Sequence, residues 1–480
     1  MSNSASAGMR IEKLLDPGSF IEIGGHVTAR NTDFNLPEKE TPADGVATGY
    51  GTIDGSLVYV YSQDSAVLGG SVGEMHARKI VHLYQMAMKM GAPVIGMIDC
   101  AGMRLQEATD ALNAFGELYL CQVNASGVIP QITAVFGSCG GGMALAPALA
   151  DFVFMEAEKA RMFVNAPNTL EDGAGKDTAS AQFQSEKAGS VDKVGSEEEI
   201  LESIRELISI LPANNEDDMS YDECGDDLNR VCEGIEGCVQ DGAKALAMIS
   251  DDGFFYEVKE GFAKNMVTGF IRLNGVTAGA VANRTERRDE EGNVAETFEP
   301  RLTSNGCMKA AEFISFCDAF NIPVLTLVQA EGMKADFHQE LRIAKSMAKM
   351  TCAYAGATVP KVTVIVGKAY GTAYTVMNSK GIGADLVYAW PDTAVGMMDA
   401  ESAARIIYAE EIRQAENAPA LIGEKAAEYA ALQGSPLSAA RRGYIDHIIQ
   451  PGDTRKYVIG AFEMLFTKRE DRPSKKHGTV

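Results

Sequence analysis

Two glycine-rich segments are the first places in the sequence where chemistry could occur. SCGGGMALAPAL (138–149) follows the apolar run ITAVF, and KAYGTAYTVM (368–377) follows the apolar run VTVIV. A strand that ends in small residues and opens a helix presents backbone N–H groups at the positive end of that helix. Such groups can bind a phosphate, or an oxygen that becomes negative during a reaction, where each donor is worth roughly 2.7–4 kcal/mol. Either turn alone could equally serve close helix–sheet packing, and neither matches a Walker A or dinucleotide-binding motif.

Other candidates for chemistry are few. None of the 6 histidines stands in a Ser-His-Asp or HExxH context, and no metal-ligand spacing occurs, so we expect no metal site. Four aspartates near predicted strand ends are better explained as capping or turn residues than as acids or bases: Asp64, Asp99, Asp151 and Asp385. Two oxyanion-type turns without an evident acid or base favour a reaction whose protons are handled by the substrate or cofactor.

Lys89 lies in AMKM (87–90), which is similar to the sequence around a biotin-attachment lysine. Apolar residues repeat at helical spacing before it, and they are Ile80, Leu83, Tyr84, Ala87 and Met88. We therefore predict a helix that ends at Gly91, with a capping box from Ser71 to Glu74. The polar face of this helix would hold Lys79, His82, Gln85 and Lys89. A helical surface lysine is not a biotin carrier, which needs a tight turn in a small separate domain.

The chain contains an internal repeat. GAPVIGMIDCAGMR (91–104) aligns with NIPVLTLVQAEGMK (321–334), and ASGVIPQITAVFGSCGGGM (125–143) aligns with AGATVPKVTVIVGKAYGTA (355–373). Glycines 102 and 332, and 141 and 371, pair at one constant offset of 230 positions. Such a repeat predicts two similar domains.

Each repeat predicts the same α/β unit: a strand after proline ends in a glycine turn, a helix crosses, and a second strand runs into a glycine-rich turn. We place the domains at 1–215 and 240–480. The segment 216–239, which shares the acidic stretch NNEDDMSYDECGDD (214–227), is expected to be a linker.

Composition excludes several classes of protein. Hydrophobic residues make up 46% of the 480, and no apolar run is long enough to span a bilayer. The net charge of −23 argues against nucleic acid as a partner. The N-terminal sequence has no export signal, and the 9 cysteines form no Cys-x-x-Cys pair, so we expect a cytoplasmic location.

Long stretches of the sequence resemble the carboxyltransferase (beta-type) subunit of biotin-dependent acyl-CoA carboxylases, of the propionyl-CoA and methylmalonyl-CoA kind, and the alpha subunit of methylmalonyl-CoA decarboxylase. The stretches include DGVATGYGTIDG (44–55), SQDSAVLGGSVGEMHARKI (62–80), GFAKNMVTGFIRLNG (261–275), RRGYIDHIIQPGDTRKYV (441–458) and the ending KHG (476–478), together with both glycine turns. The resemblance implies a tandem duplication of two crotonase-like (ClpP/crotonase) domains. It also implies a homo-hexamer, a trimer of dimers.

The resemblance further implies the reaction, which is carboxyl transfer between biotin and the α-carbon of a short acyl-CoA. Biotin would arrive on a biotin carboxyl carrier protein, charged by a biotin carboxylase subunit, and its ureido nitrogen would take the α-proton. Gly141 and Gly142 would bind the thioester oxygen, and Thr372 and Ala373 the biotin oxygen. Further contacts are assigned to Gly371, Gly102 and Gly332 for the cofactor and to Gly140, Met143 and Thr375 for the substrate.

The sequence departs from the family pattern at three places. Thr372 replaces a glycine of the second turn, and a threonine held at positive φ would cost of order 1–3 kcal/mol, so we predict negative φ there. QAEGM (329–333) replaces a Val-Pro-Gly-Phe segment, and AQFQSEKAGSVDK (181–193) replaces a Glu-Glu-Leu-Gly-Gly-Ala segment. The acyl chain length therefore does not carry over.

Three functions remain open. The first is a carboxyltransferase for acetyl- or propionyl-CoA. The second is the same half-reaction run backwards, in the alpha subunit of a sodium-pumping methylmalonyl-CoA or glutaconyl-CoA decarboxylase with membrane subunits as partners. The third is a non-catalytic assembly subunit.

Overall fold

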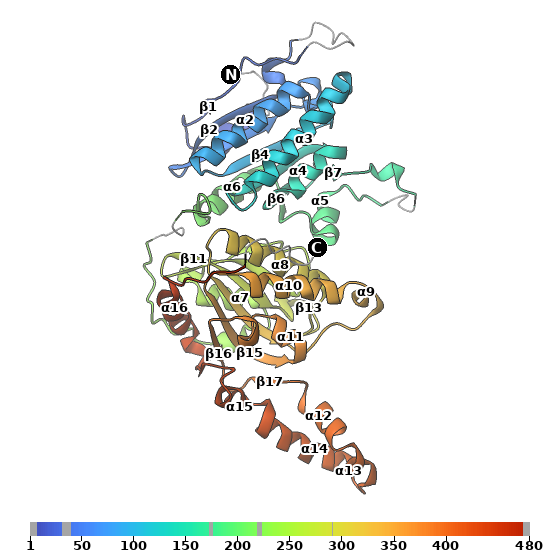
Figure 1. Cartoon of the computed structure of the whole chain (residues 1–480), viewed down its shortest axis with the longest axis vertical. Helices are drawn as coiled ribbons and strands as arrows, with labels where there is room; N and C mark the ends of the chain where they lie inside the picture. Colours follow the sequence, from blue (N-terminus) through green and yellow to red (C-terminus); the bar gives the residue numbers. More distant parts are fainter. Residues whose placement is uncertain (1–6, 31–39, 172–175, 218–222, 290, 474–480) are drawn as a thin grey trace. The chain divides into compact units, whose positions relative to one another are not determined.

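The computed structural model describes residues 7–30, 40–171, 176–217, 223–289 and 291–473, so the ending KHG (476–478) lies outside it. The chain divides into two units, Met1–Ser220 and Tyr221–Val480. Figure 1 shows each unit as a sheet with helices packed on it. No helix in the described ranges has the length and apolarity to cross a membrane.

The first unit has one mixed sheet. Over its described residues the strand order is β1-β2-β3-β4-β5-β6-β8, and β7 pairs with β5. The first three strands are antiparallel neighbours, whereas β3 to β8 run parallel. The strands are β1 (Ile21–Glu22), β2 (Val46–Ile53), β3 (Ser56–Gln63), β4 (Val94–Cys100), β5 (Gln131–Gly140), β6 (Phe152–Glu156), β7 (Arg161–Phe163) and β8 (Lys193–Gly195).

Two long helices of this unit, α2 and α3, lie side by side on the sheet (Figure 1). The helices are α1 (Ala7–Leu14), α2 (Glu74–Met90), α3 (Ala108–Ala125), α4 (Leu145–Ala148), α5 (Ala181–Phe183) and α6 (Glu197–Ile210).

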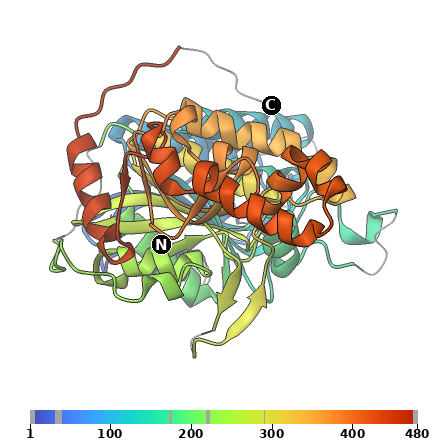
Figure 2. The same ribbon diagram turned by 90° about the horizontal axis from the view of Figure 1, so that it is seen from below.

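The second unit repeats this sheet. Its order over the described residues is β9-β10-β11-β14-β15-β16-β18, with β17 paired to β15. The strands are β9 (Tyr256–Val258), β10 (Met266–Leu273), β11 (Val276–Asn283), β14 (Val324–Ala330), β15 (Lys361–Tyr370), β16 (Leu386–Ala389), β17 (Ala394–Gly396) and β18 (His447–Ile448). A separate two-stranded hairpin, β12 (Glu286–Arg288) and β13 (Val294–Thr297), extends from the body of this unit in Figure 2.

Helices α12 to α15 form an arm between β17 and β18, and Figures 1 and 2 show it projecting from the sheet of the second unit. The helices of this unit are α7 (Gly242–Ile249), α8 (Ser304–Ala319), α9 (Phe337–Glu340), α10 (Ile343–Gly356), α11 (Gly371–Val376), α12 (Ala400–Ile407), α13 (Ala409–Gln414), α14 (Ala418–Tyr429), α15 (Pro436–Arg441) and α16 (Thr454–Leu465).

The strand registers follow the repeat that the sequence predicts. Val94 pairs with Gln131 in the first sheet, and Val324 pairs with Lys361 in the second, 230 positions later in both strands. Cys100 and Cys139 have the same relation to Ala330 and Ala369. The duplication therefore extends to individual cross-strand pairs.

Part of the expected linker 216–239 is packed into the second core. Cys232, Ile235 and Val239 are buried in one cluster with Ile249 and Val458. The acidic composition of the preceding stretch, 214–227, led to the prediction of a linker although these three apolar side chains follow it.

The start of α2 differs from the expected capping box. The helix begins at Glu74 after Gly73, and the Ser71 hydroxyl donates to the Leu68 carbonyl instead of capping the helix. The Glu107 carboxylate accepts from the Glu74 N–H at 2.6 Å and takes the place of the cap. A residue far along the chain thus supplies what the local sequence was expected to supply.

Lys79 is buried, and its expected place on the solvent face of α2 was wrong. Its ammonium group donates to the carbonyls of Ala43, in the turn before β2, and of Val46, the first residue of β2. Lys309, 230 positions later, is also buried and donates to the carbonyls of Lys259 and Phe262. Hydrogen bonds to these carbonyls compensate for the water that each buried ammonium group loses. Each half of the chain thus has a turn that is held in place by a buried lysine. Lys89, by contrast, is exposed in the last turn of α2, as predicted.

Candidate active site

The first glycine turn joins β5 to a short helical segment. The strand ends at Gly140, and Gly141 begins a 3₁₀ turn (Gly141–Ala144) that continues into α4. Gly141 has φ +61°, in the left-handed region that glycine adopts without strain. The first N–H groups of such a segment have no acceptor within it. They are therefore available to a negative oxygen.

Side chains close around this turn leave little room for a side chain at Gly140 or Gly142. A Cβ at Gly142 would lie 3.0 Å from the Tyr119 hydroxyl, and one at Gly140 would lie 3.0 Å from the Phe163 ring. Gly140, Gly141 and Gly142 are half-buried, whereas the Met143 side chain is fully buried. The Met143 side chain is therefore a core residue, and only its backbone faces the turn.

A second loop supports each turn in the same way. In the first unit the Val72 N–H donates to the Gly102 carbonyl at 2.9 Å, and in the second the Leu302 N–H donates to the Gly332 carbonyl at 2.9 Å. A Cβ at Gly102 would lie 3.4 Å from the Gly140 carbonyl oxygen, so the supporting loop touches the first turn. The residues paired by sequence at an offset of 230 are thus structurally equivalent.

The second turn joins β15 to α11. Gly371 has φ +58°, and a Cβ there would lie 3.0 Å from the Met397 carbonyl oxygen. Thr372 keeps negative φ, as its identity predicts, so its N–H stays in the first turn of the helix. The threonine therefore leaves the backbone of this turn unstrained.

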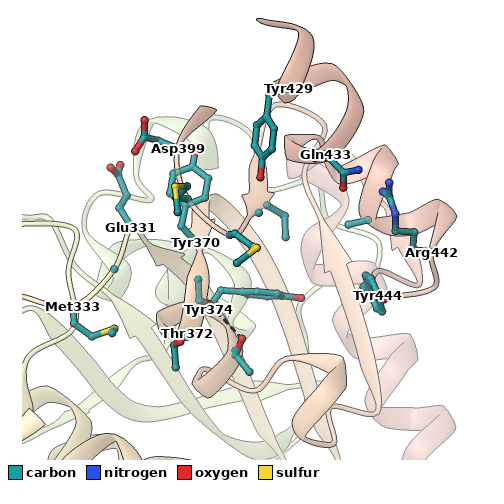
Figure 3. Close-up of a pocket in the computed structure, with 18 of the residues that line it drawn as sticks. Glu331, Met333, Tyr370, Thr372, Tyr374, Asp399, Tyr429, Gln433, Arg442 and Tyr444 are labelled. Atoms are coloured by element: carbon teal, nitrogen blue, oxygen red, sulfur yellow. Dashed lines mark hydrogen bonds between the residues drawn. The ribbon is translucent and has the colours of Figure 1, made fainter. Parts of the chain in front are cut away.

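A cavity of about 990 Å³ opens at the second turn. Gly332, Gly371, Thr372 and Thr375 line it, whereas the Ala373 side chain is fully buried and is not part of the lining. Figure 3 shows residues of the arm across the cavity from Glu331 and Met333. The lining side chains that sequence reasoning missed include Tyr370, Tyr374, Asp399, Tyr429, Gln433, Arg442 and Tyr444.

Most of these residues were missed for the same reason. Most come from the arm, and the repeat that located the turns gives no equivalent for it in the first half. The exceptions are Tyr370, directly before Gly371, and Tyr374 in α11, whose aromatic rings beside a glycine turn were an available signal.

The cavity lining includes four tyrosines, the carboxylates of Glu331 and Asp399, and the guanidinium group of Arg442. Burial raises the pKa of Tyr374 to about 12 and also raises the pKa of Tyr370, so both hydroxyls stay protonated and can donate. Hydrogen bonds from Ser402 lower the pKa of Asp399, which keeps that carboxylate charged while it caps α12. Tyr370 and Tyr374 can therefore donate hydrogen bonds to a polar ligand in the cavity.

A buried ion cluster holds the loops around the first turn. One guanidinium nitrogen of Arg104 lies 2.7 Å from a carboxylate oxygen of Asp44 and 2.7 Å from one of Glu107. A second guanidinium nitrogen donates to the Ser71 carbonyl at 2.8 Å. The side chains of the cluster are 1% exposed or less, so Arg104 joins three loops inside the protein.

The four strand-end aspartates are structural, as expected. Asp151 accepts from the Gln131 N–H and Asp385 from the Lys361 N–H, each joining two neighbouring strands at their amino ends. Asp64 caps its own loop at Ala66, and Asp99 accepts from Ser65. Among the described residues, no three His, Cys, Asp or Glu side chains gather as a metal site would require.

Two α/β units, each with a strand-to-helix turn of free N–H groups, suit an enzyme that stabilises negative charge on two oxygens. A family model described as the carboxyl transferase domain matches residues 3–480. The chain is 40% identical over 489 residues to the methylmalonyl-CoA decarboxylase subunit alpha of Veillonella parvula, covering 99% of this chain and 92% of that protein. It is 40% identical over 495 residues to the propionyl-CoA carboxylase beta chain of Roseobacter denitrificans, covering 99% and 93%.

A solved structure of transcarboxylase 12S, described as a hexamer with hydrolysed methylmalonyl-coenzyme A bound, matches with a TM-score of 0.91 and 39% identity. The match covers 98% of this chain and 92% of that one. The chain therefore belongs to the carboxyl transferase family and has its two-domain crotonase-like fold. The sequence resemblance is confirmed, and the chain is an enzyme of the biotin-dependent acyl-CoA carboxyltransferase class.

Proposed function

We propose that this enzyme moves a carboxyl group between carboxybiotin on a separate carrier protein and the α-carbon of a short acyl-CoA. Within the acetyl-/propionyl-CoA class, the propionyl-CoA/methylmalonyl-CoA pair is the best candidate, because relatives at 40% identity carry those names. The observation that carries the proposal is the matched pair of turns, with Gly141 at φ +61° and Gly371 at φ +58°, each opening a helix directly after a strand.

The chemistry explains why two such turns are useful. In a carboxyl transfer the thioester oxygen becomes more negative as the α-carbon loses its proton, and the biotin ureido oxygen becomes more negative as the carboxyl group leaves. The N–H groups of Gly141 and Gly142 would bind the thioester oxygen, with Gly140 and Met143 forming the adjacent backbone. Preorganised donors aimed at developing charge lower the barrier without reorganising.

The second turn would serve the biotin side. Thr372 and Ala373 would donate to the ureido oxygen, and Gly371 and Gly332 would leave the backbone bare beside the ring. A cavity of about 990 Å³ lined by tyrosines fits a small uncharged bicycle, and a Cβ at Gly371 would crowd the Met397 carbonyl. Biotin, when bound, supplies the carboxyl group and a ureido nitrogen that accepts the α-proton.

The remaining assignments follow from the same proposal. Gly102 would support the first turn through its contact with Gly140, and Thr375 would line the acyl end of the cavity. The partners would be a biotin carboxyl carrier protein and a biotin carboxylase subunit, in the cytoplasm, with a homo-hexamer as the assembled form.

A second direction is the decarboxylase one. The relative from Veillonella parvula is named a methylmalonyl-CoA decarboxylase subunit, at the same identity as the carboxylase relative. The same turns would then act in reverse, and the partners would be membrane decarboxylase subunits. A gene for such a membrane subunit beside the gene for this chain would favour this direction.

The test is decarboxylation of malonyl-CoA and methylmalonyl-CoA by the purified chain, with and without free biotin. We expect turnover that depends on biotin and is faster with methylmalonyl-CoA. The same rate without biotin, or no turnover with either substrate, would contradict the proposal.

A matched pair of variants tests the second turn directly. Thr372→Pro removes one N–H donor near the start of α11, where proline is tolerated, and should lower kcat by roughly 10²–10³-fold. Thr372→Ala keeps that donor and should retain kcat within a few-fold. Equal losses in the two variants would mean that the N–H is not used, provided that both melt like the wild type.

A further inference from the structure

The first turn has a hydrogen bond with no equivalent at the same position in the second turn. The Tyr119 hydroxyl, on α3, donates to the Gly142 carbonyl at 2.6 Å. The residue 230 positions later, on α10, is Lys349, which has no phenol to offer. In the second turn, instead, the Thr375 hydroxyl donates to the Gly371 carbonyl at 3.3 Å.

This bond acts on the peptide unit at the centre of the first turn. The Gly142 carbonyl shares its peptide plane with the Met143 N–H, so a donor that fixes the carbonyl also fixes the direction of that N–H. The same carbonyl accepts from the Leu145 N–H in the next turn of the helix. Two hydrogen bonds to this carbonyl restrict rotation of the peptide that follows Gly142, and Gly142 is the residue whose own N–H is assigned to the thioester oxygen.

The position of Tyr119 is itself fixed by packing. Its ring meets the edge of the buried Phe115 ring, one helical turn earlier, with centroids 5.9 Å apart. A Cβ at Gly142 would lie 3.0 Å from the Tyr119 hydroxyl, so the glycine is what lets the hydroxyl approach the backbone. Burial raises the pKa of Tyr119, so the hydroxyl keeps its proton in the neutral range and always donates.

We infer that Tyr119 is a positioning residue for carboxyl transfer: it orients the peptide after Gly142, so that the first turn is preset for the thioester oxygen. The inference rests on the proposed function, because it takes the first turn as the acyl-CoA side. Tyr119 acts through the backbone and touches no reacting atom. Its contribution is expected in the transition state, where the oxygen is most negative, and not in the binding of the substrate.

The experiment compares Tyr119→Phe with the wild type in biotin-dependent decarboxylation of methylmalonyl-CoA. The variant keeps the ring and its contact with Phe115 and loses only the oxygen. We expect kcat to fall about tenfold, less than the 10²–10³-fold loss of a direct donor, while KM changes by less than twofold. Tyr50→Phe, on β2, which β3 and β4 separate from β5 in the sheet, is the matched control and should leave both parameters unchanged.

Three outcomes would overturn the inference: an unchanged kcat in Tyr119→Phe, a rise in KM equal to the fall in kcat, or an equal loss in Tyr50→Phe. Phe115→Leu keeps the hydroxyl but loosens its support, and it should lower kcat less than Tyr119→Phe at matched melting temperatures. A wild type without biotin-dependent turnover would refute the proposed function instead, so the two failures are distinguishable.

Discussion

Removing the charge of Arg104 should destabilise the first unit without affecting the fold of the second. Arg104→Met replaces the guanidinium by an apolar chain of similar length. Asp44 and Glu107, both 0% exposed at the side chain, would be left as buried carboxylates without their cation, and the Ser71 carbonyl would lose its donor. Breaking a buried ion cluster in this way typically costs about 3–5 kcal/mol. We expect a loss of that size in the free energy of unfolding.

The single tryptophan of the chain makes the assay specific to one unit. Trp390 lies in the second core, where its ring N–H donates to Thr454, so its fluorescence reports the unfolding of that unit. Far-UV circular dichroism reports both units. In urea titrations, Arg104→Met should shift part of the dichroism transition to lower denaturant while the fluorescence transition stays in place.

The pH dependence has a defined sign. Burial raises the pKa of Asp44 and the Arg104 charge opposes that shift, so Arg104→Met should raise this pKa further. A carboxyl whose folded-state pKa is raised loses stability as the pH rises through that value. The loss of unfolding free energy in Arg104→Met, relative to the wild type, should therefore be smaller at pH 5 than at pH 8.

A variant with all three charges of the Arg104 cluster removed separates the effect of charge on stability from the effect of side-chain shape. Arg104→Met combined with Asp44→Asn and Glu107→Gln removes all three charges, and it should recover more than half of the lost stability. A loss below 1 kcal/mol in the single variant, or no recovery in the triple variant, would refute the electrostatic reasoning.

Two further predictions concern single positions. Burial raises the pKa of Asp151 to about 7, so the wild type should lose stability between about pH 4 and 7. Asp151→Asn should be more stable than the wild type by about 1–2 kcal/mol at pH 8 and by less at pH 5. Urea titrations at both pH values check this, and an equal gain in stability at both would contradict it. The new methyl group of Gly141→Ala meets open space, so this variant should lose only the backbone strain, about 1–2 kcal/mol of stability. Gly371→Ala also crowds the Met397 carbonyl and should lose more stability. Equal losses of stability in chemical denaturation would show that this contact relaxes freely.

The sequence predicted the elements that repeat, because apolar spacing and glycine positions are local signals. The helix around Lys89, the two strands before the turns and the negative φ of Thr372 are all present in the structure. The paired turns were found because one half of the chain served as a template for the other.

The features that were missed depend on contacts between distant residues. Lys79 has the helical position of a surface residue, and only the carbonyls of Ala43 and Val46 make its burial possible. The Glu107 carboxylate caps α2 from 33 residues further along the chain, and Tyr119 reaches Gly142 across 23 residues of chain. No residue pattern within one element could indicate such pairs.

The buried lysines have a consequence for an enzyme that handles reactive thioesters. Acyl-CoA thioesters acylate amines without a catalyst, and the most susceptible lysines are those with depressed pKa values. Burial lowers the pKa of Lys79 and of Lys361 to about 8, yet both ammonium groups are bound to carbonyls inside the protein. The fold thus keeps these two amines away from acyl-CoA, and their acylation would mark molecules that have begun to unfold.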